Sequence, residues 1–228
     1  MGGLISTQEF RVCVVGLDQA GKCTIIAKVE SLANWINLNK QTVTMAKINA
    51  IKKPYKKFGH VSKKILYNYE GAESDIIWNF LVMGGGKTQS TRHRAHFYAN
   101  MSALIFVVDA SDKVSIDTKR ETMGALLTQY DAKKEFEQYL TAIDKAYRKQ
   151  IGKDENDQKV ISDAPILVFA NKNDKDSTMG HVEIEERLGL HELGTKRKWR
   201  VEEKAKFAFL FFKTTMNIII YNYNIFFL

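Results

Sequence analysis

The fold of this chain is decided by one stretch, Gly16-Leu17-Asp18-Gln19-Ala20-Gly21-Lys22-Cys23. It follows an apolar run, residues 10–15, and precedes a helix-like segment that begins at Thr24. A strand, a glycine-bounded loop ending in lysine and a helix are typical of a phosphate-binding loop, whose backbone N–H groups point at phosphate oxygens. The stretch therefore predicts a nucleotide site formed by Gly16, Asp18, Gln19, Ala20, Gly21, Lys22, Cys23 and Thr24.

Cys23 departs from this motif. The residue after the lysine is normally a serine or threonine, whose hydroxyl binds Mg²⁺ beside the phosphates. A cysteine sulfur is a poor ligand for this hard, oxygen-seeking cation. We therefore expect nucleotide binding with weakened metal ligation at Cys23.

Composition limits the remaining possibilities. The chain has 228 residues, 45% of them hydrophobic, so it can bury a core, and its length fits one large domain better than two. Its two cysteines make no disulfide framework and no signal peptide opens it, so a cytoplasmic setting is expected. A net charge of +8 suits an anionic partner such as a nucleotide or an acidic lipid surface. Nucleic-acid-binding motifs are absent, so no nucleic acid partner is expected.

A second motif, Asn171-Lys172-Asn173-Asp174, follows the apolar run of residues 165–170. Ligands of open α/β sheets bind outside the carboxyl ends of the strands, so this motif is well placed to recognise a base. The Asp174 carboxylate can accept hydrogen bonds from N1–H and the 2-amino group of guanine, which adenine does not offer. Lys172 can lie over the base and Asn171 can brace the phosphate loop. Together the two motifs predict a guanine-nucleotide site.

The other elements fit an α/β fold. Apolar runs at residues 80–83, 104–109 and 165–170 are typical of strands buried in a parallel sheet, and residues 114–153 and 179–193 have helical spacing. We predict a doubly wound, mostly parallel sheet with insertions. Residues 51–79 predict a hairpin with a long exposed loop, and their lysines suggest a membrane- or partner-facing patch as an alternative: Lys52, Lys53, Lys56, Lys57, Lys63 and Lys64.

Thr42 is a candidate sensor of the γ-phosphate and Mg²⁺, as loop threonines are in switch GTPases. Thr44 qualifies equally, and both residues could instead simply begin an edge strand. The glycine run that contains Gly85 can approach a γ-phosphate closely or make an ordinary turn.

The hydrolytic groups are missing where they are expected. A hydrolysing switch needs an acidic residue near the end of the preceding strand to support Mg²⁺, and a glutamine after the glycines to orient water. The chain has Val82 or Met83 at the first position and Gly86 or Lys87 at the second. We therefore name no catalytic residue and expect hydrolysis to be weak or absent.

The ends of the chain carry two further signals. Gly2, with Ser6, fits the pattern for N-myristoylation, although a short unmodified terminus gives the same sequence. Residues 207–228 are hydrophobic but interrupted by Lys213 and by asparagines, so we expect a poorly amphipathic or buried segment rather than a tail anchor.

The order of these motifs resembles a small GTPase, and the loop at residues 16–22, the strand at 104–109 and the segment at 188–193 resemble the Arf family. Thr42-Val43, residues 47–49 and the third glycine resemble the ciliary Arl-thirteen branch, known as an exchange factor with weak hydrolysis. The resemblance implies a small GTPase domain at residues 1–201, followed by an atypical segment at 202–228. It also implies GTP/GDP and Mg²⁺ as cofactors, a myristoylated Gly2, and effector and exchange proteins as partners.

The expected function is a membrane-associated GDP/GTP switch in vesicle or ciliary trafficking, peripheral on Golgi, endomembrane or ciliary membranes. One alternative is a non-hydrolysing GTPase-like scaffold or exchange factor. A second is a P-loop ATPase or nucleotide kinase, which would show no preference for guanine.

Overall fold

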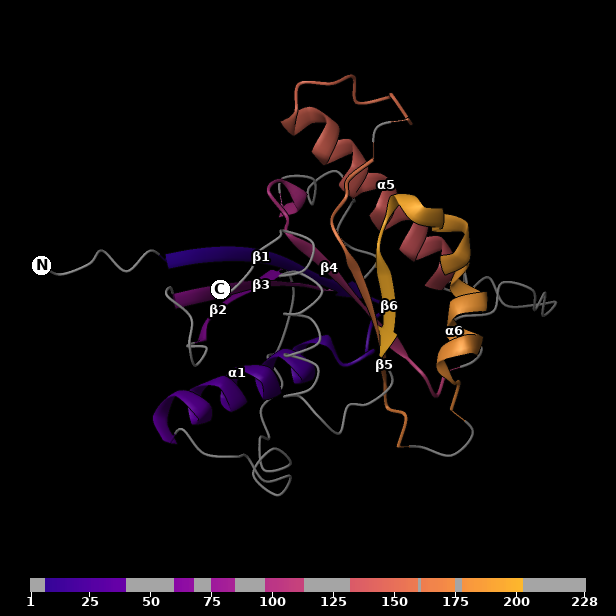
Figure 1. The fold of residues 1–228 in the computed structure, drawn as a ribbon. Coiled ribbons are helices and arrows are strands. Elements are labelled where there is room, and N and C mark those ends of the chain that lie inside the picture. The colour runs from indigo at the N-terminus through magenta and orange to yellow at the C-terminus, as the bar shows by residue number, and fades with distance from the viewer. Residues whose placement is uncertain are drawn as a thin grey trace, which may run out of the picture.

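The structure is a computed structural model, and it describes residues 7–39, 60–67, 75–84, 97–112, 132–159, 161–174 and 178–202. In these residues one six-stranded sheet is formed by β1 (Thr7–Gly16), β2 (His60–Tyr67), β3 (Asp75–Met83), β4 (Ala103–Asp109), β5 (Ile166–Asn171) and β6 (Trp199–Glu202). The helices are α1 (Lys22–Asn39), α5 (Ala132–Gln150) and α6 (His181–Leu188), followed by a 3₁₀ segment, η1 (Leu190–Lys196). Figure 1 shows these elements.

The sheet has the strand order β2-β3-β1-β4-β5-β6. β3, β1, β4, β5 and β6 are parallel, and β2 pairs antiparallel with β3. After β1 the chain adds strands first on one side of it and then on the other, which creates a switch point at the carboxyl ends of the central strands. The predicted doubly wound, mostly parallel sheet is confirmed.

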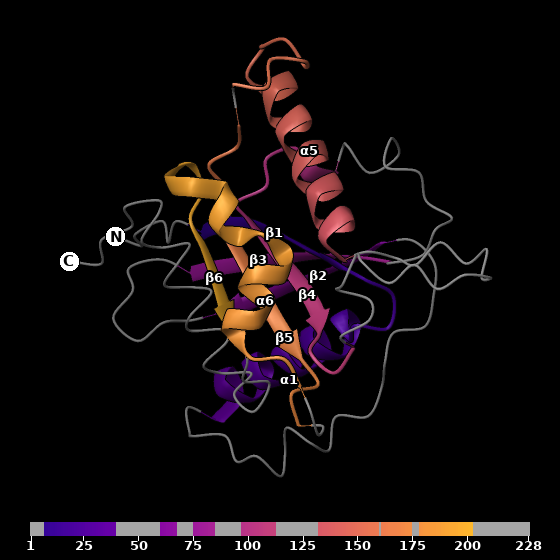
Figure 2. The ribbon, with the colours of Figure 1, turned by 90° about the vertical axis from the view of Figure 1, so that its right-hand side faces the viewer.

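Helices cover both faces of this sheet (Figures 1 and 2). Along β1, Val12 and Val14 belong to the cluster that packs with α1, and Cys13 and Val15 to the cluster that packs with α5 and α6. All four side chains are fully buried. Burial on both faces explains why residues 12–15 are continuously apolar and not alternating.

The hairpin predicted in residues 51–79 is present as β2 and β3. Its second strand begins at Asp75, earlier than the apolar run at residues 80–83 indicated. Lys63 pairs with Glu30 and Lys64 with Glu9, each at 3.0 Å between nitrogen and oxygen. Two lysines of the basic run are therefore neutralised by neighbouring acids, and the other four lie outside the described residues.

The long helical pattern at residues 114–153 corresponds to α5 in its second half, and residues 113–131 lie outside the described residues. The polar residues 151–159 that follow α5 form turns. No apolar run in the sequence indicated β6. This strand is four residues long, lies at the sheet edge and is only partly buried, so it lacks an alternating apolar pattern.

A buried arginine ties α5 to the segments entering β5 and β6. The Arg197 guanidinium donates to the Asp144 carboxylate of α5, and its Nε donates to the Ser162 carbonyl at 3.1 Å. Asp144 also accepts the Ser162 amide at 2.9 Å. The Arg197 side chain is 4% exposed, so water screens this ion pair little.

Replacing Arg197 with methionine is expected to lower the free energy of unfolding by about 3–5 kcal/mol, because Asp144 loses its cation in a largely buried site and keeps only the Ser162 amide as a partner. Urea unfolding measures this loss. The matched control is Lys145→Met, which breaks the exposed pair with Glu155 and should cost less than about 1 kcal/mol. Equal losses in the two variants would contradict the interpretation of Arg197 as a buried anchor.

Candidate nucleotide-binding site

The predicted phosphate loop connects β1 directly to α1, because β1 ends at Gly16 and α1 begins at Lys22. Gly16 has φ +135°, and a Cβ there would lie 2.1 Å from the Val107 carbonyl oxygen of β4. Gly21 has φ +94°, and a Cβ there would lie 2.2 Å from Asn171 Nδ2. Both glycines are therefore required by close approaches as well as by backbone conformation.

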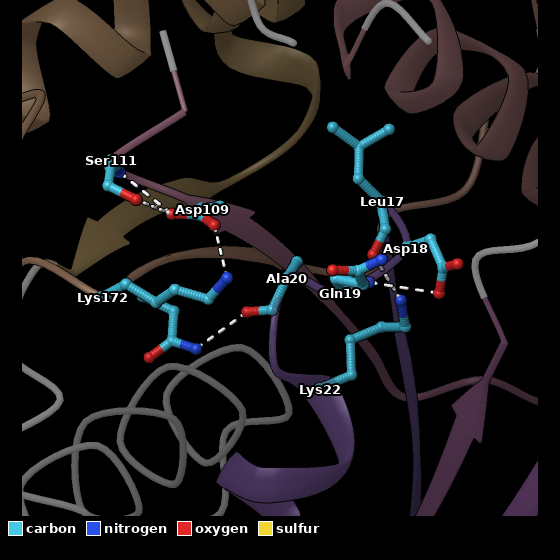
Figure 3. Close-up of polar contacts among 9 residues, drawn as sticks. Leu17, Asp18, Gln19, Ala20, Lys22, Asp109, Ser111 and Lys172 are labelled. Atoms are coloured by element: carbon cyan, nitrogen blue, oxygen red, sulfur yellow. Dashed lines mark hydrogen bonds and ion pairs between the residues drawn. The ribbon is translucent and has the colours of Figure 1, made fainter. Parts of the chain in front are cut away.

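Lys22 is buried and lies across the loop. Its Nζ donates to the Gly16 carbonyl at 2.7 Å and to the Leu17 carbonyl at 2.6 Å. Figure 3 shows its side chain extending towards Leu17, Asp18 and Gln19. The loop thus curves around its own lysine, and the ammonium group is held inside the loop by two backbone carbonyls.

The remaining loop residues divide into buried and exposed ones. Leu17 is buried in the core cluster on the α5 side, so it serves packing. Asp18, Gln19 and Thr24 are exposed. The backbone N–H of Gln19 donates to Asp18 Oδ1 at 3.1 Å. Cys23 is a free, partly buried cysteine that packs against the core cluster on the α1 side.

Asn171 connects the two predicted motifs. Its Nδ2 donates to the Ala20 carbonyl at 2.7 Å, so residues 151 positions apart meet at the carboxyl ends of β1 and β5. This is the contact that the sequence suggested when it placed Asn171 as a brace of the phosphate loop. The bond holds the second motif beside the first.

Lys172, the next residue, is fixed in an unexpected way. Its φ is +62°, uncommon for a residue with a side chain, and its Nζ lies 2.5 Å from Asp109 Oδ2 at the end of β4. The sequence placed Asp109 only at the end of the apolar run of residues 104–109 and indicated no partner for it. The sheet register explains the contact, since Asp109 lies opposite Asn171, the residue before Lys172, in the β4–β5 pairing.

The surroundings of Asp109 stabilise its carboxyl group in the charged form. Burial alone would raise its pKa, but hydrogen bonds from Lys172 and Ser111 outweigh burial and hold the pKa below its usual value. Because the folded pKa is depressed, the contribution of this carboxylate to stability is present at neutral pH. It is lost as the pH falls through the lowered pKa.

Asp174 lies exposed in the turn that follows β5. Its position at the carboxyl end of that strand suits a group that meets a ligand from outside the sheet. Its reading of guanine stays a prediction. The other predicted site residues, Gly2, Thr42, Gly85, Gly86 and Lys87, lie outside the described residues, as do Thr44 and residues 203–228.

The described residues do not fit a protein-ligated Mg²⁺. Cys23 offers sulfur, and Val82 and Met83, at the end of β3, are apolar and only 3% and 2% exposed. Within the described residues, no three histidine, cysteine, aspartate or glutamate side chains gather as a metal site. In the same part of the chain, none of the helices is both long and apolar enough to cross a bilayer.

A phosphate loop between β1 and α1, with a second motif held against it at the end of β5, defines a P-loop α/β protein. Residues 143–209 match the model of the ADP-ribosylation factor family. The whole fold is similar to the Arl6 BBS3 small GTPase from Trypanosoma brucei with the bound nucleotide analogue GppNp. The TM-score is 0.55 and the identity 20%, covering 93% of this chain and 98% of that chain. The chain therefore has the small GTPase fold.

Proposed function

We propose that this protein binds guanine nucleotide and acts as an Arf-like GDP/GTP switch. The observation that carries the proposal is the 2.7 Å hydrogen bond from Asn171 to Ala20, which joins the base-recognition motif to the phosphate loop. The match of residues 143–209 to the ADP-ribosylation factor family supports the same function. The likeness to a small GTPase that binds GppNp agrees with it.

Each motif has a distinct part in binding. Backbone N–H groups of the phosphate loop and the Lys22 ammonium hold the phosphates, while Asp174 accepts two hydrogen bonds from guanine. Thr42 or Thr44, together with Gly85, contacts the γ-phosphate. The loops that contain them then change conformation between the GDP and GTP states.

The resemblance to the Arl-thirteen branch suggests where the switch acts. A myristoylated Gly2 would place it on a membrane of the Golgi, the endomembrane system or the cilium. Exchange and effector proteins would bind the loops that change between the GDP and GTP states. The three successive glycines at residues 84–86 and the segments near Thr42 support this trafficking role.

A second candidate function is that of a non-hydrolysing scaffold or exchange factor. The burial of apolar Val82 and Met83 where an acidic residue is expected favours it, because no described side chain there supports a metal. Both candidates share guanine binding and differ in turnover.

The decisive experiment identifies the nucleotide retained by the purified full-length chain and then follows single-turnover hydrolysis. Retained GDP or GTP, displaced by guanine nucleotides but not by ATP, supports the proposal. Equal competition by ATP and GTP would show a P-loop ATPase or kinase and remove the guanine role of Asp174. Guanine binding without turnover would favour the scaffold.

Cys23→Thr tests the metal ligand. Restoring a hydroxyl is expected to raise the ratio of GTP affinities with and without Mg²⁺ by at least about tenfold, since oxygen suits this cation and sulfur does not. Equilibrium titration in magnesium and in EDTA measures the ratio. Cys23→Ala, which removes sulfur without adding oxygen, should leave it unchanged. An unchanged ratio in Cys23→Thr would show that Cys23 does not limit metal binding.

A further inference from the structure

An ion pair joins the carboxyl ends of β4 and β5. Lys172 Nζ lies 2.5 Å from Asp109 Oδ2, and the two side chains are 30% and 17% exposed (Figure 3). By contrast, the side chains of the surface pair Lys64–Glu9 are 59% and 43% exposed. The Lys172–Asp109 pair is therefore screened less by water and fixes its partners more firmly.

Asp109 is itself held in place. Its Oδ1 accepts the Ser111 amide at 3.0 Å and the Ser111 hydroxyl at 2.6 Å. The backbone adds a further link, since the Ala110 amide donates to the Asn171 carbonyl at 2.8 Å. With both oxygens engaged, the carboxylate has one orientation, and it offers Lys172 a fixed point of attachment.

The backbone of Lys172 is also constrained. A φ of +62° is a left-handed conformation that costs a side-chain-bearing residue free energy. Such strain persists only where surrounding contacts determine it, and the bond to Asp109 is such a contact. The left-handed turn and the ion pair together set where the four methylene groups of Lys172 lie.

We propose that Asp109 and Ser111 form a clamp that positions Lys172 for guanine-nucleotide binding, which makes Asp109 a positioning residue of the site. This inference rests on the proposed function. With its amine bound to Asp109, Lys172 presents its methylene chain as a fixed apolar surface for the plane of the base. Its charge is then already paired and is not offered to the phosphates.

Two consequences separate this clamp from a general electrostatic effect. Loss of the clamp weakens the binding of GDP and of GTP by the same factor, because the clamped methylene chain contacts the base, which the two nucleotides share, and not the phosphates. It also leaves the ratio of GDP to IDP affinity unchanged, because IDP lacks only the 2-amino group assigned to Asp174.

The test measures dissociation rates of fluorescent GDP, GTP and IDP from the full-length chain. Asp109→Asn is expected to release all three about tenfold faster, since a charge-assisted hydrogen bond is lost. Lys172→Met should do the same, and the double variant should be no faster than Lys172→Met alone, because the two residues act as one unit. Ser111→Ala should give a smaller increase and serves if Asp109→Asn does not fold.

Glu9→Gln, which breaks the exposed Lys64 pair, is the matched control and should leave the rates unchanged. Additive effects of Asp109→Asn and Lys172→Met would overturn the clamp and indicate a structural role for Asp109. Unchanged rates in Asp109→Asn, with normal guanine binding by the wild type, would overturn this inference alone. A wild type without guanine preference would overturn the proposed function as well.

Discussion

Replacing Gly16 with alanine is expected to abolish nucleotide retention and to lower the free energy of unfolding by at least about 3 kcal/mol. The added Cβ would lie 2.1 Å from the Val107 carbonyl oxygen, far inside van der Waals contact. Val107 cannot retreat, because it lies in the central strand β4 opposite Gly16 in the parallel register. The backbone of the loop must therefore move, and its N–H groups lose the directions that phosphate binding requires.

Gly152→Ala is the control for this substitution. Gly152 also has a positive φ, +68°, but a Cβ there meets no heavy atom within 4 Å. It should cost only the backbone strain of about 1 kcal/mol and leave nucleotide retention intact. Urea unfolding and the nucleotide content of the purified protein give both quantities. If the two variants behaved alike, backbone strain and not the clash with Val107 would account for the effect of Gly16→Ala.

The strands that position the site were predictable because they are buried on both faces. Residues 12–15 of β1 and most of β4 and β5 are consecutive apolar residues, as expected where helices cover both faces of a sheet. The carboxyl ends of such parallel strands lie at one edge, so the meeting of Asn171 with the phosphate loop also followed from the sequence.

The contacts that the sequence did not indicate are pairs of side chains far apart in the chain. Lys172 and Asp109 are 63 residues apart, and Arg197 and Asp144 are 53 apart. Such pairs leave no periodic pattern, because each side chain occupies one position. The partner is fixed by the sheet register for Lys172 and Asp109, and by the packing of α5 against the segment before β6 for Arg197 and Asp144. β6 was also not predicted from the sequence. It is a short edge strand that is only partly buried, so its residues show no apolar pattern.

The unusual residues near the predicted metal site form one consistent group. Cys23 provides sulfur where a hydroxyl is expected, and β3 ends in buried Val82 and Met83 where a carboxylate is expected. The phosphate loop nevertheless keeps both close glycine contacts and its internally bound Lys22. Retention of nucleotide and loss of turnover are separable, since the first depends on backbone N–H groups and the second on a positioned metal and water.

Asp174→Asn is expected to lower the affinity for guanine nucleotides roughly 10³-fold and to raise that for xanthine nucleotides. The carboxylate of Asp174 is an acceptor on both oxygens, which matches the N1–H and 2-amino donors of guanine. An asparagine amide places a donor against one of them, and that guanine donor is left unpaired. Xanthine carries an oxygen in place of the 2-amino group and accepts the new donor.

Competition of GTP, XTP and ATP against a fluorescent guanine nucleotide measures this change in specificity. Asp154→Asn is the control, because Asp154 lies in the loop after α5. An asparagine there can still accept the hydrogen bond from the backbone N–H of Asn156. It should bind guanine nucleotides as the wild type does. Equal losses of GTP and XTP in Asp174→Asn would mean that the residue shapes the turn after β5 and does not contact the base. A true exchange of preference requires that the side chain meets the 2-position of the purine directly.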